Sequence, residues 1–202
     1  MQSWCSKAMK RGLMAIGFAV LAVSWALAQQ KKSVLPPPKP ADEGPSLEVT
    51  MKFIQDKLND VGAVNYATYT HDNAVGNDWT NQFRVEATKV VADANSCRIS
   101  YHWKASLDGK AGQDSDGWFL LKSVADVAVM PMEQDLKAQA TAQGHPTWNS
   151  RIEPPVFVLK VHRADKGGNV FDFFDEQMAN RVAKAMVHAV ELCGGGSKPE
   201  PF

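Results

Sequence analysis

Two segments with helical periodicity bracket a long stretch in which apolar and polar residues alternate. Ser46 can cap the first helix and Gly62 can end it, while Asp175 can cap the second and Gly194 can end it. Their apolar stripes contain Leu47, Met51, Ile54, Leu58 and Val61 in the first helix and Ala179, Val182, Met186, Ala189 and Cys193 in the second. Helix, antiparallel strands and helix in this order predict an α+β domain.

The stretch between the helices has the period of two that is typical of half-buried strands. Residues 79–91 and 97–106 alternate in this way, and the turn residues 93–96 between them predict an antiparallel hairpin with one dry face. The dry face is expected to carry Phe83, Val85, Ala87, Cys97, Ile99, Tyr101 and Trp103. Residues 156–161 and 170–174, separated by a glycine turn, predict a second hairpin.

The other segments carry weaker signals. Residues 66–69 predict a short strand, residues 118–130 predict strand structure broken near 123–126, and residues 133–143 predict a short helix. The polar residues 107–117 and the glycine- and proline-rich residues 144–155 predict loops.

The last third of the chain resembles the closing strands and capping helix of pleckstrin-homology-like (PH-like) barrels. The resemblance lies in element order: strand 156–161, glycine turn, aromatic strand 170–174 and the acid-capped helix 175–193. It implies a bent, near-orthogonal antiparallel barrel plugged by that helix. Phosphoinositide binding is not carried over, because no basic cluster stands between the first strands, and the N-terminal helix is an addition. The expected fold is a curved antiparallel sheet or a partly open PH-like barrel, flanked by an N-terminal helix and a C-terminal amphipathic helix.

The N-terminal residues have the pattern of a secretory signal. Met9-Lys10-Arg11 precedes a run without charge, and the small residues Ala26 and Ala28 suit a peptidase site. Cleavage is predicted after Ala28, which places the protein in the periplasm or outside the cell. The alternative is an uncleaved membrane anchor, since the apolar residues 12–28 approach the length of about 20 that a spanning helix needs.

The predicted organisation has four parts: a signal peptide at 1–28, a proline-rich linker at 29–45, one α+β domain at 46–193 and a disordered tail at 194–202. The signal carries three basic residues and no acidic one, so its removal from a chain with 22 of each leaves an excess of three acidic residues. This charge balance argues against a nucleic-acid partner. No stable membrane span is expected after cleavage, and the oligomeric state is left open.

Cys97 and Cys193 are the two cysteines that remain after signal cleavage. An even pair in an oxidising compartment is a candidate disulfide. Both residues are in register with apolar faces, Cys97 on its strand and Cys193 on the last helix, so both are expected where helix meets sheet. Two separate buried thiols, and a reactive or metal-binding role, are the alternatives.

Metal, cofactor and catalytic motifs are not found in the sequence. The five histidines are scattered singly, without the spacing of a zinc site. Residues 113–117 resemble a calcium loop, but Gly112 and Ser123 would occupy its first and last ligand positions without a carboxylate. We therefore expect no metal, no cofactor and a solvated loop at 113–117.

Two function classes remain open. The first is a non-enzymatic binding or accessory domain whose partner is a protein of the cell envelope, with Trp148 and Arg151 as contact residues in a polar loop. The second is a small enzyme or ligand carrier that uses the concave face of the sheet, with Tyr101, His102 and Asp172 as polar groups in its mouth. The other large aromatic residues are expected in the core, except that Phe173 and Phe174 must point to opposite faces.

Overall fold

The computed structural model describes residues 44–196. The predicted signal peptide, its cleavage after Ala28, almost all of the linker and the end of the tail lie outside these residues. Within them the chain forms an α+β arrangement of antiparallel sheets and helices, as the sequence predicts.

Two sheets carry the fold. The larger has the strand order β4-β3-β2-β1-β6, and the smaller has the order β5-β7-β8. The strands are β1 Ala63–Asp72, β2 Asn77–Asp93, β3 Arg98–Leu107, β4 Lys110–Leu120, β5 Val124–Pro131, β6 Trp148–Glu153, β7 Phe157–Arg163 and β8 Gly168–Phe173. The helices are α1 Leu47–Asp60, the 3-10 turn η1 Leu121–Ser123, α2 Met132–Ala142 and α3 Glu176–Leu192.

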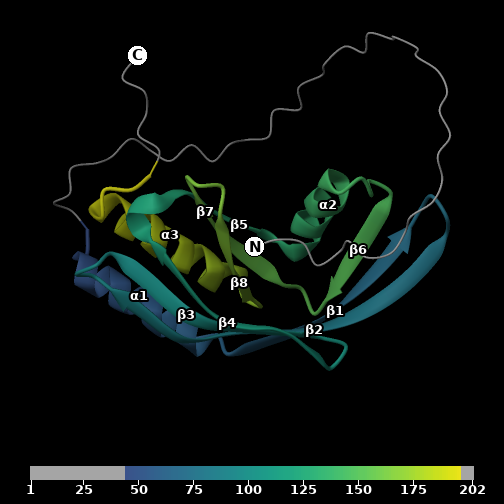
Figure 1. Ribbon diagram of the computed structural model, residues 1–202, viewed down its shortest axis with the longest axis horizontal. Helices are drawn as coiled ribbons and strands as arrows, with labels where there is room; N and C mark the ends of the chain where they lie inside the picture. Colours follow the sequence, from purple (N-terminus) through teal and green to yellow (C-terminus); the bar gives the residue numbers. More distant parts are fainter. Residues whose placement is uncertain (1–43, 197–202) are drawn as a thin grey trace, which may run out of the picture. The chain divides into compact units, whose positions relative to one another are not determined.

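The larger sheet is a curved band, and α3, the smaller sheet and α2 lie on its concave side (Figure 1). The sheets do not close into a barrel, so the structure has the curved open form of the predicted fold. This arrangement does not by itself confirm the resemblance to PH-like barrels, which stays a prediction.

The predicted helix ends are correct at both termini of the domain. The Ser46 side chain accepts a hydrogen bond from the Val49 backbone, and Gly62 follows α1 with a φ of 65°. Asp175 accepts from the Gln177 backbone at 2.8 Å. Gly194 has a φ of 73°, and after it the backbone N–H of Gly195 donates to the Val190 carbonyl at 2.8 Å, which closes α3 with a Schellman-type turn.

Two predicted loops are strands. Residues 107–117 were expected as loop, but most of them belong to β4, which pairs with β3 through a two-residue turn at Asp108 and Gly109. Both turn residues have positive φ, 50° and 73°, as a type I′ hairpin requires. Residues 144–155 were also expected as loop, but β6 lies within them and pairs with β1 at the edge of the larger sheet.

The apolar side chains form two clusters. The larger lies between the inner faces of β2–β4, helices α1 and α3, and one face of the smaller sheet, with Ile54, Ile99, Phe119, Phe171 and Met186 among its buried members. The smaller contains Val64, Met132, Ile152, Val156 and Val158, from β1, the start of α2, β6 and the region of β7. The two faces of the smaller sheet therefore belong to different clusters.

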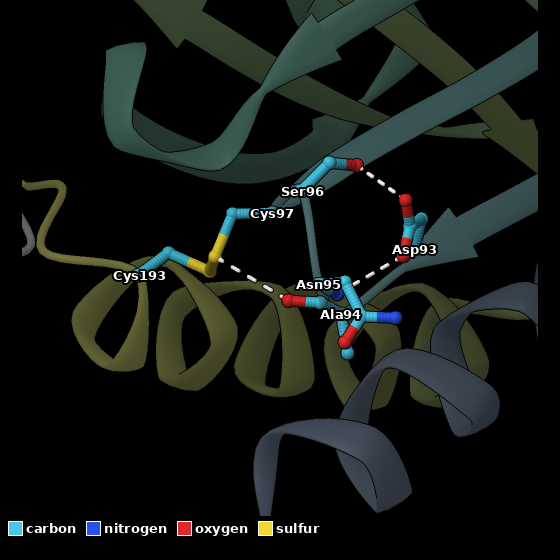
Figure 2. Close-up of a disulfide and its surroundings, with 6 residues drawn as sticks. All are labelled: Asp93, Ala94, Asn95, Ser96, Cys97 and Cys193. Atoms are coloured by element: carbon cyan, nitrogen blue, oxygen red, sulfur yellow. Dashed lines mark hydrogen bonds between the residues drawn. A yellow bond between two sulfur atoms is a disulfide. The ribbon is translucent and has the colours of Figure 1, made fainter.

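The predicted disulfide is present. The sulfur atoms of Cys97 and Cys193 are bonded, with 5.9 Å between their Cα atoms, and join the start of β3 to the end of α3 (Figure 2). The turn before Cys97 is held by Asp93, which accepts bonds from the Asn95 backbone and the Ser96 hydroxyl. The Ser96 bond is the main reason why the pKa of Asp93 lies below its usual range. The bridge closes a loop that spans most of the domain.

Replacing both cysteines tests the energetic weight of this bridge. The variant with Cys97→Ala and Cys193→Ala is expected to lose about 2–5 kcal/mol of unfolding free energy, because a 96-residue separation leaves a large loop open in the unfolded chain. Urea unfolding of both proteins measures the loss. A reductant should destabilise the wild type by a similar amount and leave the variant unchanged; equal stability of wild type with and without reductant would contradict the assignment.

Candidate functional site

The three residues predicted for a pocket mouth do not converge. Tyr101 is buried on the inner face of β3, where its ring packs edge-on against Phe171 and its hydroxyl donates to Asn169 at 2.7 Å. His102 is the next residue along the strand and points to the opposite, convex face. There its two ring nitrogens lie 3.0 Å and 2.9 Å from carboxylate oxygens of Asp114 and Asp116. Tyr101 and His102 therefore cannot share one pocket.

Asp172 is a buried carboxyl group with an incomplete set of partners. It is only 8% exposed on β8, and its Oδ1 atom has no hydrogen-bond partner among the described residues. Burial, together with the negative charge of Asp135 on α2, raises the pKa of Asp172 to about 7. Asp135 itself is paired with Lys160 of β7. Burial and the charge of Asp172 in turn raise the pKa of Tyr66.

The space beside Asp172 is too small for a substrate. Asp172 lines a cavity of about 10 Å³ between the end of α1, strands β1–β3 and β8, with Trp103 and Phe171 among its walls. That volume is about what one water molecule needs. A carboxyl group with a shifted pKa is common in active sites. Asp172, however, is buried between the two sheets, so its ionisation affects the stability of the fold.

Trp148 and Arg151 lie on a strand, not in a loop. Trp148 opens β6 and is half-buried: His145 stacks on its ring with 4.1 Å between centroids, and Trp79 contacts it edge-on at 4.9 Å. Its indole N–H donates to Asp72 at 3.1 Å. Arg151 is three residues further and faces the convex side, where its guanidinium lies 4.9 Å from the centre of the Tyr69 ring. The two residues therefore contribute to different surfaces.

Asp72 and Lys137 explain why the segment around Trp148 is ordered. Asp72 also accepts hydrogen bonds from the Ala74 backbone and the Thr147 hydroxyl, and the bond from Ala74 is the main reason why its pKa is lowered. Lys137 of α2 donates to the carbonyl oxygens of Pro146 and Trp148. These bonds fasten the region before β6 to the end of β1 and to α2.

Trp118 is the exposed tryptophan of the sheet. It was expected in the core, but 59% of it is exposed on the convex face, while its neighbour Phe119 is 1% exposed. Adjacent strand residues must face opposite sides, so the pair Trp118-Phe119 already contained this signal. Ser100 of β3 is paired with both Trp118 and Val91, and Val91 is 52% exposed. Trp118 and Val91 thus lie in one row across β4, β3 and β2, on either side of Ser100.

Beside Trp118, β4 forms an edge of the larger sheet. It pairs with β3, and no described strand pairs with its other side. Asp114 and Asp116 lie on the same convex face as Trp118, at alternate positions. Residues 113–117, which were expected to form a solvated loop, are therefore part of an edge strand with two acidic side chains.

Within residues 44–196, no three His, Cys, Asp or Glu side chains are placed to hold a metal ion. None of the helices in this range has the length and apolar character needed to cross a membrane.

No protein-family model matches the chain, no curated protein matches its sequence, and no solved structure matches its fold.

Changing Asp172 to Asn tests the buried carboxyl group. The unfolded chain loses this proton near pH 3.8 and the folded chain near pH 7, so the folded state binds the extra proton between these values and stability falls as pH rises through them. Asp172→Asn removes this fall. We expect the variant to gain a few kcal/mol of unfolding free energy relative to wild type between pH 4 and pH 8.

The measurement is urea unfolding of both proteins at the two pH values, with the disulfide intact. Asp60→Asn is the matched control, since Asp60 is exposed at the end of α1, contacts Lys57 and no histidine in the described residues, and should leave the pH dependence unchanged. If the unfolding free energies of wild type and Asp172→Asn change with pH in the same way, Asp172 ionises normally and the expected pKa shift is wrong.

Proposed function

We propose that the folded region is a non-enzymatic binding domain that works outside the cytoplasm, in the periplasm or after secretion, and that its partner is a protein of the cell envelope. The secretory pattern of residues 1–28 and the proline-rich segment after it support this location. The disulfide is compatible with it, since such bonds persist in oxidising compartments.

The observation that carries the proposal is the exposed Trp118 beside the unpaired edge of β4. Tryptophan is over-represented among residues that dominate protein interfaces. An edge strand presents free backbone N–H and C=O groups to which an extended segment can add as a further strand. Backbone pairing along β4 and an apolar contact on Trp118 and Val91 would then act together.

Charge favours a partner segment with basic residues at alternate positions. Asp114 and Asp116 face the same side of β4, and their basic neighbours His102 and Lys104 lie on β3. A strand paired on the open edge would place its own alternate side chains on the other side of these two carboxylates. A second copy of this chain fits less well. Antiparallel pairing of two full β4 strands centres on Ser115 and brings Asp114 of one copy opposite Asp116 of the other, which is repulsive.

The histidine contacts give no support to an enzyme. His71, His102 and His162 contact aspartate side chains, and His188 bonds the backbone carbonyl of Pro45 at 2.9 Å. In these contacts of the described residues no hydroxyl or thiol takes part, so none of them pairs a nucleophile with a base. The concave face is covered by α3, the smaller sheet and α2, which leaves the alternative of a carrier on that face without support.

Selection of peptides against the full chain tests the proposal. From a library of extended eight-residue peptides, binders should carry Lys or Arg at alternate positions and one apolar residue. Trp118→Ala should weaken their binding at least 10-fold, the loss expected when a central aromatic contact is removed. Isothermal titration gives the affinities, and hydrogen exchange should show new protection in β4.

Phe174→Ala is the matched control, because Phe174 is 46% exposed and follows β8, a strand of the smaller sheet that does not pair with β4. It should bind the peptides as wild type does. Peptides without the basic pattern, an unchanged affinity for Trp118→Ala, or protection outside β4 would each overturn the proposal.

A further inference from the structure

A second surface lies on the convex face at the opposite end of the larger sheet, across β2, β1 and β6. It is a shallow groove of about 400 Å³, a volume within the range of small-molecule sites. The strand register sets six side chains in two rows of three. One row is Thr80, Tyr69 and Arg151, and the other is Asp78, His71 and Asn149. Thr70, Trp79 and Ser150 complete the lining.

We propose that this groove binds a neutral, hydroxyl-rich ligand of the saccharide class. The inference is independent of the proposed partner surface, because β4 and β6 are the two opposite edges of the sheet. It differs from the concave-face carrier considered for the sequence, since every side chain of the two rows faces away from the core.

The charges in the groove argue for a neutral ligand. His71 Nδ1 lies 2.8 Å from Asp78 Oδ1, and Arg151 Nη1 lies 2.5 Å from Glu153 Oε1. Asp78 and Arg151 are the lining side chains with a permanent charge, one of each sign, so the lining has no large excess of charge. A strongly ionic ligand would have to compete with these pairs.

The remaining polar groups suit hydroxyls, which both donate and accept hydrogen bonds. Asn149 uses its carbonyl oxygen to accept from Lys137 at 3.1 Å, which leaves its NH₂ group for a ligand. The hydroxyl groups of Thr80 and Tyr69 and the second carboxylate oxygen of Asp78 add donors and acceptors. A sugar ring carries several hydroxyl groups close together, so more than one of them can bond to side chains of the two rows.

The aromatic ring of Tyr69 supplies an apolar surface for the C–H face of a sugar. The Arg151 guanidinium lies over one face of the Tyr69 ring and fixes its orientation. Tyr69 is still 38% exposed, and a sugar would contact this remaining surface. A side chain that is already held loses little conformational freedom when a ligand binds. Tyr69 is therefore the residue on which affinity should depend most.

Chemical-shift mapping of the disulfide-bonded full chain tests this inference. The probes are glucose, galactose, mannose and N-acetylglucosamine with their neutral disaccharides, and glucuronate and glucosamine as charged counterparts. At least one neutral probe should shift the amides of β1, β2 and β6 around the groove. Tyr69→Ala should weaken that binding at least 10-fold, and Tyr69→Phe, which keeps the ring, should weaken it less.

Asn65→Ala is the matched control, since Asn65 lies on the same face of β1 outside the groove. Asn65→Ala should bind the sugar as wild type does. Trp118→Ala, which tests the β4 edge, should also leave sugar binding unchanged, so the two proposals can fail independently. The proposal is overturned if no neutral probe shifts the groove at 50 mM, if a charged counterpart binds more tightly, or if Tyr69→Ala keeps full affinity.

Discussion

The second half of β2 is held on one side by β3 and on the other by side chains of α1. Strand β1 starts opposite Glu86, so the backbone of β2 beyond that point has no partner strand on this side. Asn59 of α1 fills the gap: its side chain accepts from the Val90 N–H at 2.9 Å and donates to the Val90 carbonyl at 2.9 Å. Gln55 accepts from the Ala92 N–H at 3.1 Å. Helix α1 is thereby fixed to the sheet by backbone groups that would otherwise lack partners.

Much of the fold follows from this contact. The register of β2 against β3 shifts between Thr88 and Val91, where Lys89 has a φ of 52°, so Val90 turns inward and Val91 outward beside Trp118. The same irregularity therefore forms part of the core and part of the proposed partner surface. Helix α3 packs on α1, and the Cys97–Cys193 bridge ties its far end back to β3. The contact of α1 with β2 thus orients both helices.

The elements that the sequence predicts well are those with local signals. Helix caps at Ser46 and Asp175 and the facing cysteines come from short patterns, and the structure confirms them. The pair Asp108-Gly109 is also a local signal, because Asp-Gly is typical of two-residue hairpin turns. It indicates that a strand follows, which is β4, where a loop was expected. The irregularity at Lys89 has no such signal, because β-forming residues surround it. The groove is not predictable in this way, since its rows join residues about 80 positions apart in the sequence through the pairing of β1 with β6.

Hydrogen exchange at the Val90 amide tests most directly whether α1 replaces a strand beside β2. In the wild type, the Val90 and Ala92 amides should exchange as slowly as amides inside the β2–β3 ladder. Asn59→Ala should release the Val90 amide selectively, by about 10-fold or more for a lost hydrogen bond worth about 1–2 kcal/mol, while the ladder amides stay protected. A wild-type Val90 amide that exchanges as fast as a free edge amide, or equal protection in Asn59→Ala, would contradict this account.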